Sequence, residues 1–202
     1  MTETFVHVDR LGELEPGDVL DLDWSMQLTD EDKSAVTAQN EAVLRDLYPE
    51  GLSRHGVRYV LTMVGPDQNV TTSGKSEPLV AFLDTVDPET EGVFSKPTSA
   101  LYEWFVELVR LAEFSECQSR FQSFFAWDSQ DQIRDLPQVD DQRQQVVKAR
   151  CNAYTRRDMS LISCASFSQG FANARRYWRG AASDDPVWEI VMEPPVQVIE
   201  TI

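Results

Sequence analysis

The feature that most constrains this chain is a run of nine residues, 119–127, in which polar side chains interrupt a pattern typical of a buried strand. Phenylalanine, alanine and tryptophan fill five of the positions, and Arg120 and Ser123 lie among them. Charged side chains are rarely buried without a partner, so a core strand has no need of an arginine. The run therefore predicts a strand that carries polar groups to a defined place in the interior.

Two other strand-like segments carry the same kind of polar residue. His7 lies within the apolar opening 5–8, and Glu189 lies within the closing run 187–192. If the three strands are neighbours, His7, Arg120 or Ser123, and Glu189 converge on one cleft, which is the candidate site. The alternatives are that His7 is a hydrogen-bonded core histidine and that Glu189 points outward from an amphipathic strand.

Length and charge limit the classes of function. With 202 residues, 42% of them hydrophobic, the chain suits one domain, residues 1–202, with a sizeable core. A net charge of -16 disfavours sustained binding to a nucleic-acid backbone. Only four of the 18 basic residues are lysines, and an acidic, lysine-poor surface suits concentrated salt, which screens self-repulsion. The expectation of a halophilic protein competes with that of an ordinary acidic one.

The N-terminal sequence, the apolar runs and the cysteine usage indicate a cytoplasmic chain. The first residues are polar with no apolar signal region, and no apolar run is long enough to span a bilayer, so we expect no membrane partner. The three cysteines, Cys117, Cys151 and Cys164, are odd in number and lack the spacing of a zinc site. We therefore expect free thiols and no metal.

Hydrophobic periodicity predicts a mixture of strands and helices. Strands are expected at 5–9, 19–22, 57–61, 119–127, 145–151, 187–192 and 196–200, and helices at 36–47, 99–113 and 166–179, with a short helix from 128 to Pro137. Because the elements do not follow a strict β-α-β order, the pattern indicates an α+β fold with a mixed sheet. Glycines and prolines across 65–97 predict a loop-rich segment that can form a mobile flap.

Two helices bear on the site. In the helix at 99–113 the apolar residues Leu101, Phe105, Leu108, Val109 and Ala112 share a face, which predicts their burial, while Glu103, Glu107 and Arg110 lie on other faces. In the helix at 166–179 three arginines, Arg175, Arg176 and Arg179, occupy the last turns. Cations there complement the helix dipole, although the same residues would also suit a phosphate.

Several familiar chemistries find no support. The glycines never form G-x-G-x-x-G, and Gly74-Lys75-Ser76 lacks the earlier glycine of a phosphate-binding loop. There are two histidines, no G-x-S-x-G elbow and no H-E-x-x-H motif, which argues against serine hydrolases and zinc proteases.

A set of short motifs resembles a known family. The runs at 5–8, 47–56, 119–126, 158–161, 177–180 and 186–190 are similar, in that order, to a prokaryotic domain family of unknown function with an ADP-ribosyltransferase-like fold. The resemblance covers roughly residues 5 to 199. It implies a split mixed β-sheet with flanking helices that holds NAD in a cleft.

The resemblance also implies roles for individual residues. His7 would bind the adenine-side ribose, Ser123 would support the cleft beside the nicotinamide, and Glu189 would hydrogen-bond the nicotinamide ribose. His55 with Gly56 matches the first-strand His-Gly of the polymerase-like branch equally well, so either histidine is a candidate for NAD contact.

The middle motif lacks the tyrosine that stacks on nicotinamide in this fold. Tyr59 or Phe124 would take its place, and Arg120 lies in the same motif. Position 187 is valine, so the paired glutamates of arginine-modifying toxins are not present.

These observations lead to one hypothesis and two alternatives. The leading hypothesis is an NAD-dependent ADP-ribosyltransferase that cleaves the nicotinamide-ribose bond and passes ADP-ribose to an unknown acceptor. The first alternative is a non-catalytic domain of the same fold that binds a nucleotide-like ligand or a partner protein, with Arg120 and the arginines at 175–179 as anion contacts. The second is a structural acidic module whose polar strand residues all face solvent.

Overall fold

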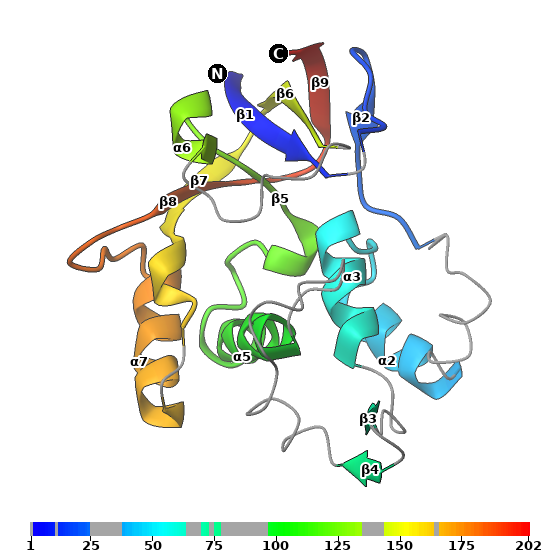
Figure 1. Cartoon of the computed structure of the whole chain (residues 1–202), viewed down its shortest axis with the longest axis vertical. Coiled ribbons are helices and arrows are strands. Elements are labelled where there is room, and N and C mark those ends of the chain that lie inside the picture. Colours follow the sequence, from blue (N-terminus) through cyan, green and yellow to red (C-terminus); the bar gives the residue numbers. More distant parts are fainter. Residues whose placement is uncertain are drawn as a thin grey trace.

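Helices and antiparallel strands make up the computed structural model, which describes residues 2–10, 12–24, 38–63, 70–72, 75–77, 97–134, 144–163 and 166–202 (Figure 1). The strands are β1 (Glu3–Asp9), β2 (Val19–Leu20), β3 (Val70–Thr72), β4 (Lys75–Glu77), β5 (Phe124–Ala126), β6 (Gln145–Cys151), β7 (Tyr154–Asp158), β8 (Trp188–Met192) and β9 (Val196–Thr201). The helices are α2 (Ala38–Leu47), α3 (Arg54–Met63), α5 (Pro97–Glu113), α6 (Gln130–Arg134) and α7 (Phe167–Trp178), with the 3-10 turns η1 (Arg120–Gln122) and η2 (Met159–Leu161). The α+β class is confirmed.

The main strands form two sheets. One has the order β1-β6-β9-β2 and the other the order β5-β8-β7, while β3 and β4 form a separate hairpin. The sheets meet where Val6 and Trp127 exchange backbone hydrogen bonds of 2.9 and 2.8 Å. Every pairing among the described strands is antiparallel, which corrects the expectation of a mixed sheet.

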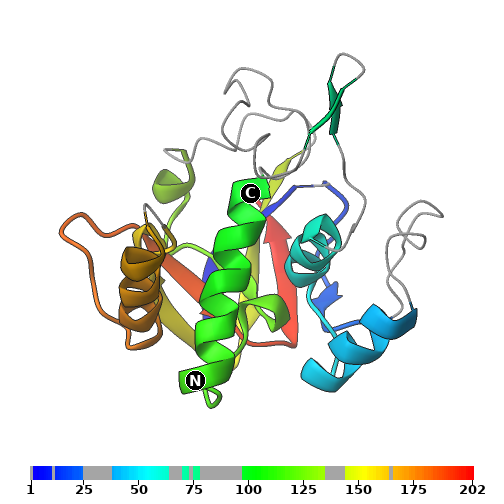
Figure 2. The same cartoon turned by 90° about the horizontal axis from the view of Figure 1, so that it is seen from below.

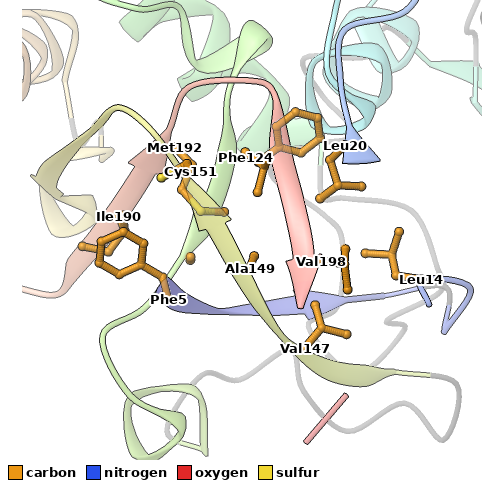
Figure 3. Packing of buried hydrophobic residues seen from close by; sticks show 12 residues of the cluster. Phe5, Leu14, Leu20, Phe124, Val147, Ala149, Cys151, Ile190, Met192 and Val198 are labelled. Carbon is orange, nitrogen blue, oxygen red and sulfur yellow. The ribbon is translucent and has the colours of Figure 1, made fainter. Parts of the chain in front are cut away.

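An apolar core lies between the two sheets (Figure 3). Alternate residues of each strand enter it because successive side chains point to opposite faces of a sheet. From the four-stranded sheet come Val147 and Ala149 of β6, and from the three-stranded sheet come Ile190 and Met192 of β8. We refer to this cluster as the apolar core; its remaining members are Phe5, Leu14, Leu20, Phe124, Ala126, Cys151, Val196 and Val198.

Helices α2, α3, α5 and α7 lie on the side of the three-stranded sheet away from the four-stranded sheet, whereas the short helix α6 lies beside β1 (Figure 1). Helix α5 runs between α7 and α3 (Figure 2). Trp178 of α7 donates its indole hydrogen to the Val106 carbonyl of α5 at 2.9 Å. Helix α7 begins after Ser166, whose hydroxyl caps it, and ends before Gly180, whose φ of 71° suits the predicted glycine cap.

Residues 57–61 were expected to form a strand, but they belong to helix α3. Ser53 caps this helix, with its Oγ accepting a hydrogen bond from Gly56 N at 3.2 Å. The helix also lies tightly against η1, since a Cβ at Gly56 would lie 2.1 Å from the carbonyl oxygen of Phe121. Burial of Val60 among α2 and η1 residues outweighs the preference of its β-branched neighbours for a strand.

The segment 119–127 is not one strand. It begins as the turn η1, capped by Ser119, and only Phe124–Ala126 pairs as β5. Most of the loop-rich segment 65–97, with its predicted flap, lies outside the described residues, and the two described pieces form the β3-β4 hairpin. Helix α6 ends at Arg134, and the predicted continuation to Pro137 also lies outside the described residues.

Candidate functional site

Four buried polar side chains meet between the three-stranded sheet and the helices, and we call them the Arg120 cluster: Glu103, Arg120, Tyr177 and Glu189. The Arg120 guanidinium binds Glu103 through two hydrogen bonds, of 2.7 Å from Nε and 2.9 Å from Nη2. Its Nη1 donates to the Tyr177 hydroxyl and to Glu189 Oε1. Tyr177 in turn donates to Glu189 Oε1 at 2.9 Å, so a single carboxylate oxygen accepts from two donors.

Each member of the cluster comes from a different element. Glu103 is on α5, Arg120 begins η1, Tyr177 is on α7 and Glu189 is the second residue of β8. Because side chains alternate along β8, Ile190 enters the apolar core while Glu189 points to the helices. Glu189 is only 3% exposed, so the outward orientation considered for it is wrong.

The polar residues of α5 are buried, contrary to the periodicity argument. Glu103, Glu107 and Arg110 are all buried, whereas Leu108 is 56% exposed and Ala112 is exposed. The reason is that α5 has neighbours on more than one side, and the residues facing η1 are those that pair with Arg120 and Ser119. A helix enclosed in this way buries polar positions as well as an apolar stripe.

The cluster has an excess of acid. Two carboxylates share one guanidinium, which leaves one negative charge when both are ionised. Burial raises the pKa of Glu189, and Arg120 opposes that rise. Burial alone would lower the pKa of Arg120, but Glu103 and Glu189 hold it well above its ordinary value. Burial also raises the pKa of Tyr177, which therefore stays a neutral hydrogen-bond donor.

Aromatic rings border the cluster on its half-exposed side. The Arg120 guanidinium lies 4.4 Å from the centre of the Phe125 ring. The His55 ring contacts Phe125 at 4.4 Å and Tyr59 at 4.5 Å between ring centres. His55 Nε2 lies 3.8 Å from Glu103 Oε1, and its side chain is 26% exposed. His55 is thus a partly exposed neighbour of the buried charges, and Tyr59 packs against its ring.

The predicted site residues divide into those at the cluster and those apart from it. Arg120, Glu189, His55 and Tyr59 belong to the cluster or its aromatic border. His7 lies close by, with Nδ1 2.6 Å from the Phe125 carbonyl oxygen, and burial lowers its pKa.

Ser123 and Phe124 do not join the cluster. Ser123 is buried and donates to the Ser119 carbonyl at 2.7 Å, so it braces the turn that carries Arg120. Phe124 enters the apolar core on the other face of the sheet. The polar residue at 123 is therefore explained by the turn.

The sequence interpretation missed Glu103 and assigned no role to Tyr177. A signal for Glu103 was present in the chain, because Glu103, Glu107 and Arg110 follow the i, i+4, i+7 spacing that aligns side chains along one helical face. Tyr177 lay in one of the quoted motifs without a stated chemistry. Only its position opposite Glu189 in the fold shows that its hydroxyl has an acidic partner.

A second buried hydrogen-bond network, centred on Glu107, helps to position the Arg120 cluster. Glu107 Oε1 accepts from Tyr48 at 3.0 Å, from Ser119 at 2.8 Å and from Arg110 Nε at 2.9 Å. Burial and the neighbouring Glu107 raise the pKa of Tyr48, which remains a donor. These bonds tie the end of α2, helix α5 and the residue before η1 together. Arg120 therefore begins a turn that is fixed from both sides.

The two described cysteines have thiols that are weaker acids than usual. Cys117 and Cys151 are free, and burial raises the pKa of both, that of Cys151 to about 11, so neither is a reactive thiolate. In the part of the chain that the structure describes, no three histidine, cysteine or acidic side chains gather as metal ligands would. No described helix has the length and apolar character needed to cross a membrane.

Comparison with known proteins identifies a family. The search of curated proteins finds no match. A family model described as a protein of unknown function, DUF2441, matches residues 6–202, and that range contains the whole Arg120 cluster together with His7, His55 and Tyr59. The match extends over nearly the full length, so the chain belongs to the DUF2441 family.

Proposed function

We propose that this chain is an NAD-dependent, ADP-ribosyltransferase-like protein that binds NAD at the border of the Arg120 cluster. In the proposed reaction it breaks the bond between nicotinamide and ribose and transfers ADP-ribose to an acceptor. The observation that carries the proposal is the buried Glu189 carboxylate, held by two donors behind a border of aromatic side chains.

The charge of the cluster suits this chemistry. When the C1′–N bond breaks, the electron pair leaves with nicotinamide and the ribose becomes positively charged. The acceptor then bonds to C1′ and loses a proton. A fixed carboxylate near the ribose stabilises that charge more in the transition state than in the ground state. The excess carboxylate in a buried setting makes the effect stronger than it would be in water.

The aromatic border suits the substrate. The oxidised nicotinamide ring is flat and carries a positive charge, and aromatic faces attract cations. Tyr59 and Phe125 both contact the imidazole of His55, so one of these rings can stack on nicotinamide while His55 or His7 binds a ribose hydroxyl. We assign Arg120, Tyr177 and Ser123 positioning roles, since they hold the carboxylate or the turn.

The chain's free thiols fit a reducing compartment, and we place the proposed activity in the cytoplasm. The acceptor is then an intracellular protein, nucleic acid or small molecule. A chain of net charge -16 would recognise a nucleic acid only at a local site.

One observation favours the non-catalytic alternative. Glu189 Oε1 already accepts from both Arg120 and Tyr177, and the side chain is almost fully buried. A ribose hydroxyl can reach this oxygen only if one donor moves. A domain of the same fold that binds a nucleotide-like ligand, or a partner protein, without turnover needs no such movement.

The variant Glu189→Gln separates the two functions. Glutamine keeps the shape and an acceptor oxygen, and its neutrality leaves Arg120 in a one-to-one pair with Glu103, so we expect the variant to fold. The wild type should release nicotinamide from NAD, and the variant should do so at least about a hundredfold more slowly. Free nicotinamide is measured at low and high salt, and NAD affinity is measured by calorimetry.

The matched control is Glu200→Gln, which removes an exposed carboxylate of β9 that pairs with Lys148 of β6. It should retain wild-type release of nicotinamide. NAD binding by both proteins with no release by either would support the non-catalytic domain. Absence of NAD binding by the wild type would contradict an NAD-dependent function altogether.

A further inference from the structure

A small hollow lies at one end of the four-stranded sheet, with a volume of about 270 Å³. It is lined by Thr2, Val19, Arg150, Cys151, Asn152, Pro195 and Gln197. The central lining residues come from adjacent strands, since Arg150 of β6 is opposite Gln197 of β9, and Gln197 is opposite Val19 of β2. The pairing of β6, β9 and β2 therefore brings the central lining residues side by side.

The hollow opens on the outer face of this sheet. In β6 the side chains of Val147 and Ala149 enter the apolar core, so Lys148 and Arg150 point the other way. The same alternation places Gln197 outside, because Val196 and Val198 are core residues. The Arg120 cluster lies beyond the second sheet, on its helix side, so the hollow is a separate place in the molecule.

The residues that line the hollow differ in charge from the chain as a whole. The chain has 34 acidic and 18 basic residues, yet none of the seven lining residues is acidic. Lys148, which lies two residues before Arg150 on the same face, forms an ion pair with Glu200. Arg54, Arg110, Arg120, Arg156 and Arg175 each pair with a carboxylate. Among the described residues Arg150 forms no ion pair with a carboxylate, which is also true of Arg157, Arg176 and Arg179. Of these four arginines, Arg150 is the one that lines the hollow, and it is half-buried.

The remaining lining residues supply what an anionic ligand needs. A guanidinium has five hydrogen-bond donors and matches a carboxylate or phosphate with two parallel bonds. Asn152, Gln197 and Thr2 add amide and hydroxyl donors, while Val19, 58% exposed, and Pro195 add an apolar wall. The volume is a little below the roughly 300–1,000 Å³ of drug-sized sites, so the ligand is small.

We propose that this hollow binds a small organic anion. Its oxyanion group, a carboxylate or a phosphate, meets the guanidinium of Arg150, and its apolar part lies against Val19 and Pro195. The proposal is independent of NAD chemistry at the Arg120 cluster. It assigns a ligand to the one described arginine of this sheet face that has no carboxylate partner.

Four probes test the chemistry by NMR titration of the intact chain: benzoate, phenyl phosphate, inorganic phosphate and benzylamine. We expect saturable binding of benzoate or phenyl phosphate, with shifts confined to residues of the hollow, and the better of the two identifies the oxyanion. Inorganic phosphate should bind more weakly because it has no apolar part. Benzylamine should not bind there, although its positive charge favours it on a protein of net charge -16.

Two matched variants locate the binding group. Arg150→Gln and Lys148→Gln each remove one positive charge from the same strand and face, and the Arg150 side chain makes no hydrogen bond to another described residue. We expect Arg150→Gln to weaken anion binding at least about tenfold, as loss of a charge-assisted hydrogen bond does, and Lys148→Gln to leave it unchanged. Arg150→Lys should retain part of the affinity, because lysine keeps the positive charge but lacks the two parallel hydrogen-bond donors of a guanidinium.

Three results would overturn the proposal. They are absence of saturable binding by all three anions, an equal loss in the Arg150 and Lys148 variants, and binding of benzylamine in the hollow as tight as that of benzoate. An equal loss would show a bulk charge effect. Loss of nicotinamide release in the Glu189→Gln variant has no bearing on any of these measurements, so the two proposals fail separately.

Discussion

Strand β8 contributes side chains to two buried regions, the apolar core and the Arg120 cluster, which are held by different kinds of interaction. Ile190 and Met192 enter the apolar core, where every contact is non-directional and nearby apolar side chains substitute for one another at modest cost. Glu189, the residue before Ile190, enters the Arg120 cluster, where its carboxylate has specified hydrogen-bond partners. Both sets of side chains are almost fully buried, so burial alone does not distinguish the two regions.

The difference lies in what burial does to the folding free energy. Burying apolar surface stabilises the fold by about 25 cal/mol per Å². Burying charges costs several kcal/mol per ion before their attraction offsets it, and apolar replacements of buried ion pairs are often at least as stable. We therefore expect the Arg120 cluster to add little to stability compared with an apolar replacement, and a role in binding or chemistry would give a reason for its presence.

The largest expected effect comes from removing the cation of the Arg120 cluster and leaving its two carboxylates in place. Arg120→Leu leaves Glu103 and Glu189 buried without their cation, and we expect a loss of about 3–5 kcal/mol in the free energy of unfolding. The measurement is urea denaturation followed by tryptophan fluorescence. Adding Glu103→Gln and Glu189→Gln to the same protein should recover much of the loss. A triple variant no more stable than Arg120→Leu would show that the ion cluster does stabilise the fold.

A smaller effect is expected from a carboxylate that is paired with backbone groups. Asp158 is buried and accepts from Ser160 N at 3.0 Å, Val187 N at 3.0 Å and Ser183 N at 2.6 Å. Burial tends to raise its pKa, but these hydrogen bonds hold the pKa below its ordinary value of 3.8. Asp158→Asn should lose about 1–2 kcal/mol at neutral pH, because neutral acceptors form weaker bonds.

The sign of the pH dependence separates the two carboxylates. Because the pKa of Asp158 is lowered on folding, its stabilisation is present above pH 3.8 and is lost as pH falls through the folded pKa. Glu189 has a raised pKa, so its contribution is present below its ordinary value of 4.5 and is lost as pH rises through the folded pKa. Urea denaturation across pH should show Asp158→Asn approaching wild type in acid. A constant difference at all pH values would contradict this assignment.

The smallest effect is expected in the apolar core. Ile190→Val removes one methylene group beside Glu189 in sequence, and we expect a loss of about 1 kcal/mol. Nothing ionises at this position, so the loss should be the same from acid to neutral pH, and NAD binding should not change. A pH-dependent loss would mean that the two sides of β8 are energetically coupled and do not act as separate regions.

Much of the fold could be predicted because its periodic segments are long. The strands at β1, β6, β8 and β9 and the helices α5 and α7 lie within a few residues of their predicted bounds. Helix α3 and turn η1 were misassigned, since a glycine contact and side-chain caps decide them. At the site, Arg120 and Glu189 were predicted to converge and do, whereas Ser123 and Phe124 serve the turn and the core.

The amino-acid sequence by itself determined the alternation on β8, because neighbouring side chains of a strand must point to opposite faces, and it marked Glu189 as a polar residue on one of them. It also determined the acidic balance of the chain, with 34 acidic and 18 basic residues. Only the tertiary structure decided that Glu103 and Tyr177, 74 residues apart in the chain, meet Arg120 at the same point. Such contacts depend on the packing of helices against a sheet, and hydrogen-bond partners distant in sequence leave no periodic signal.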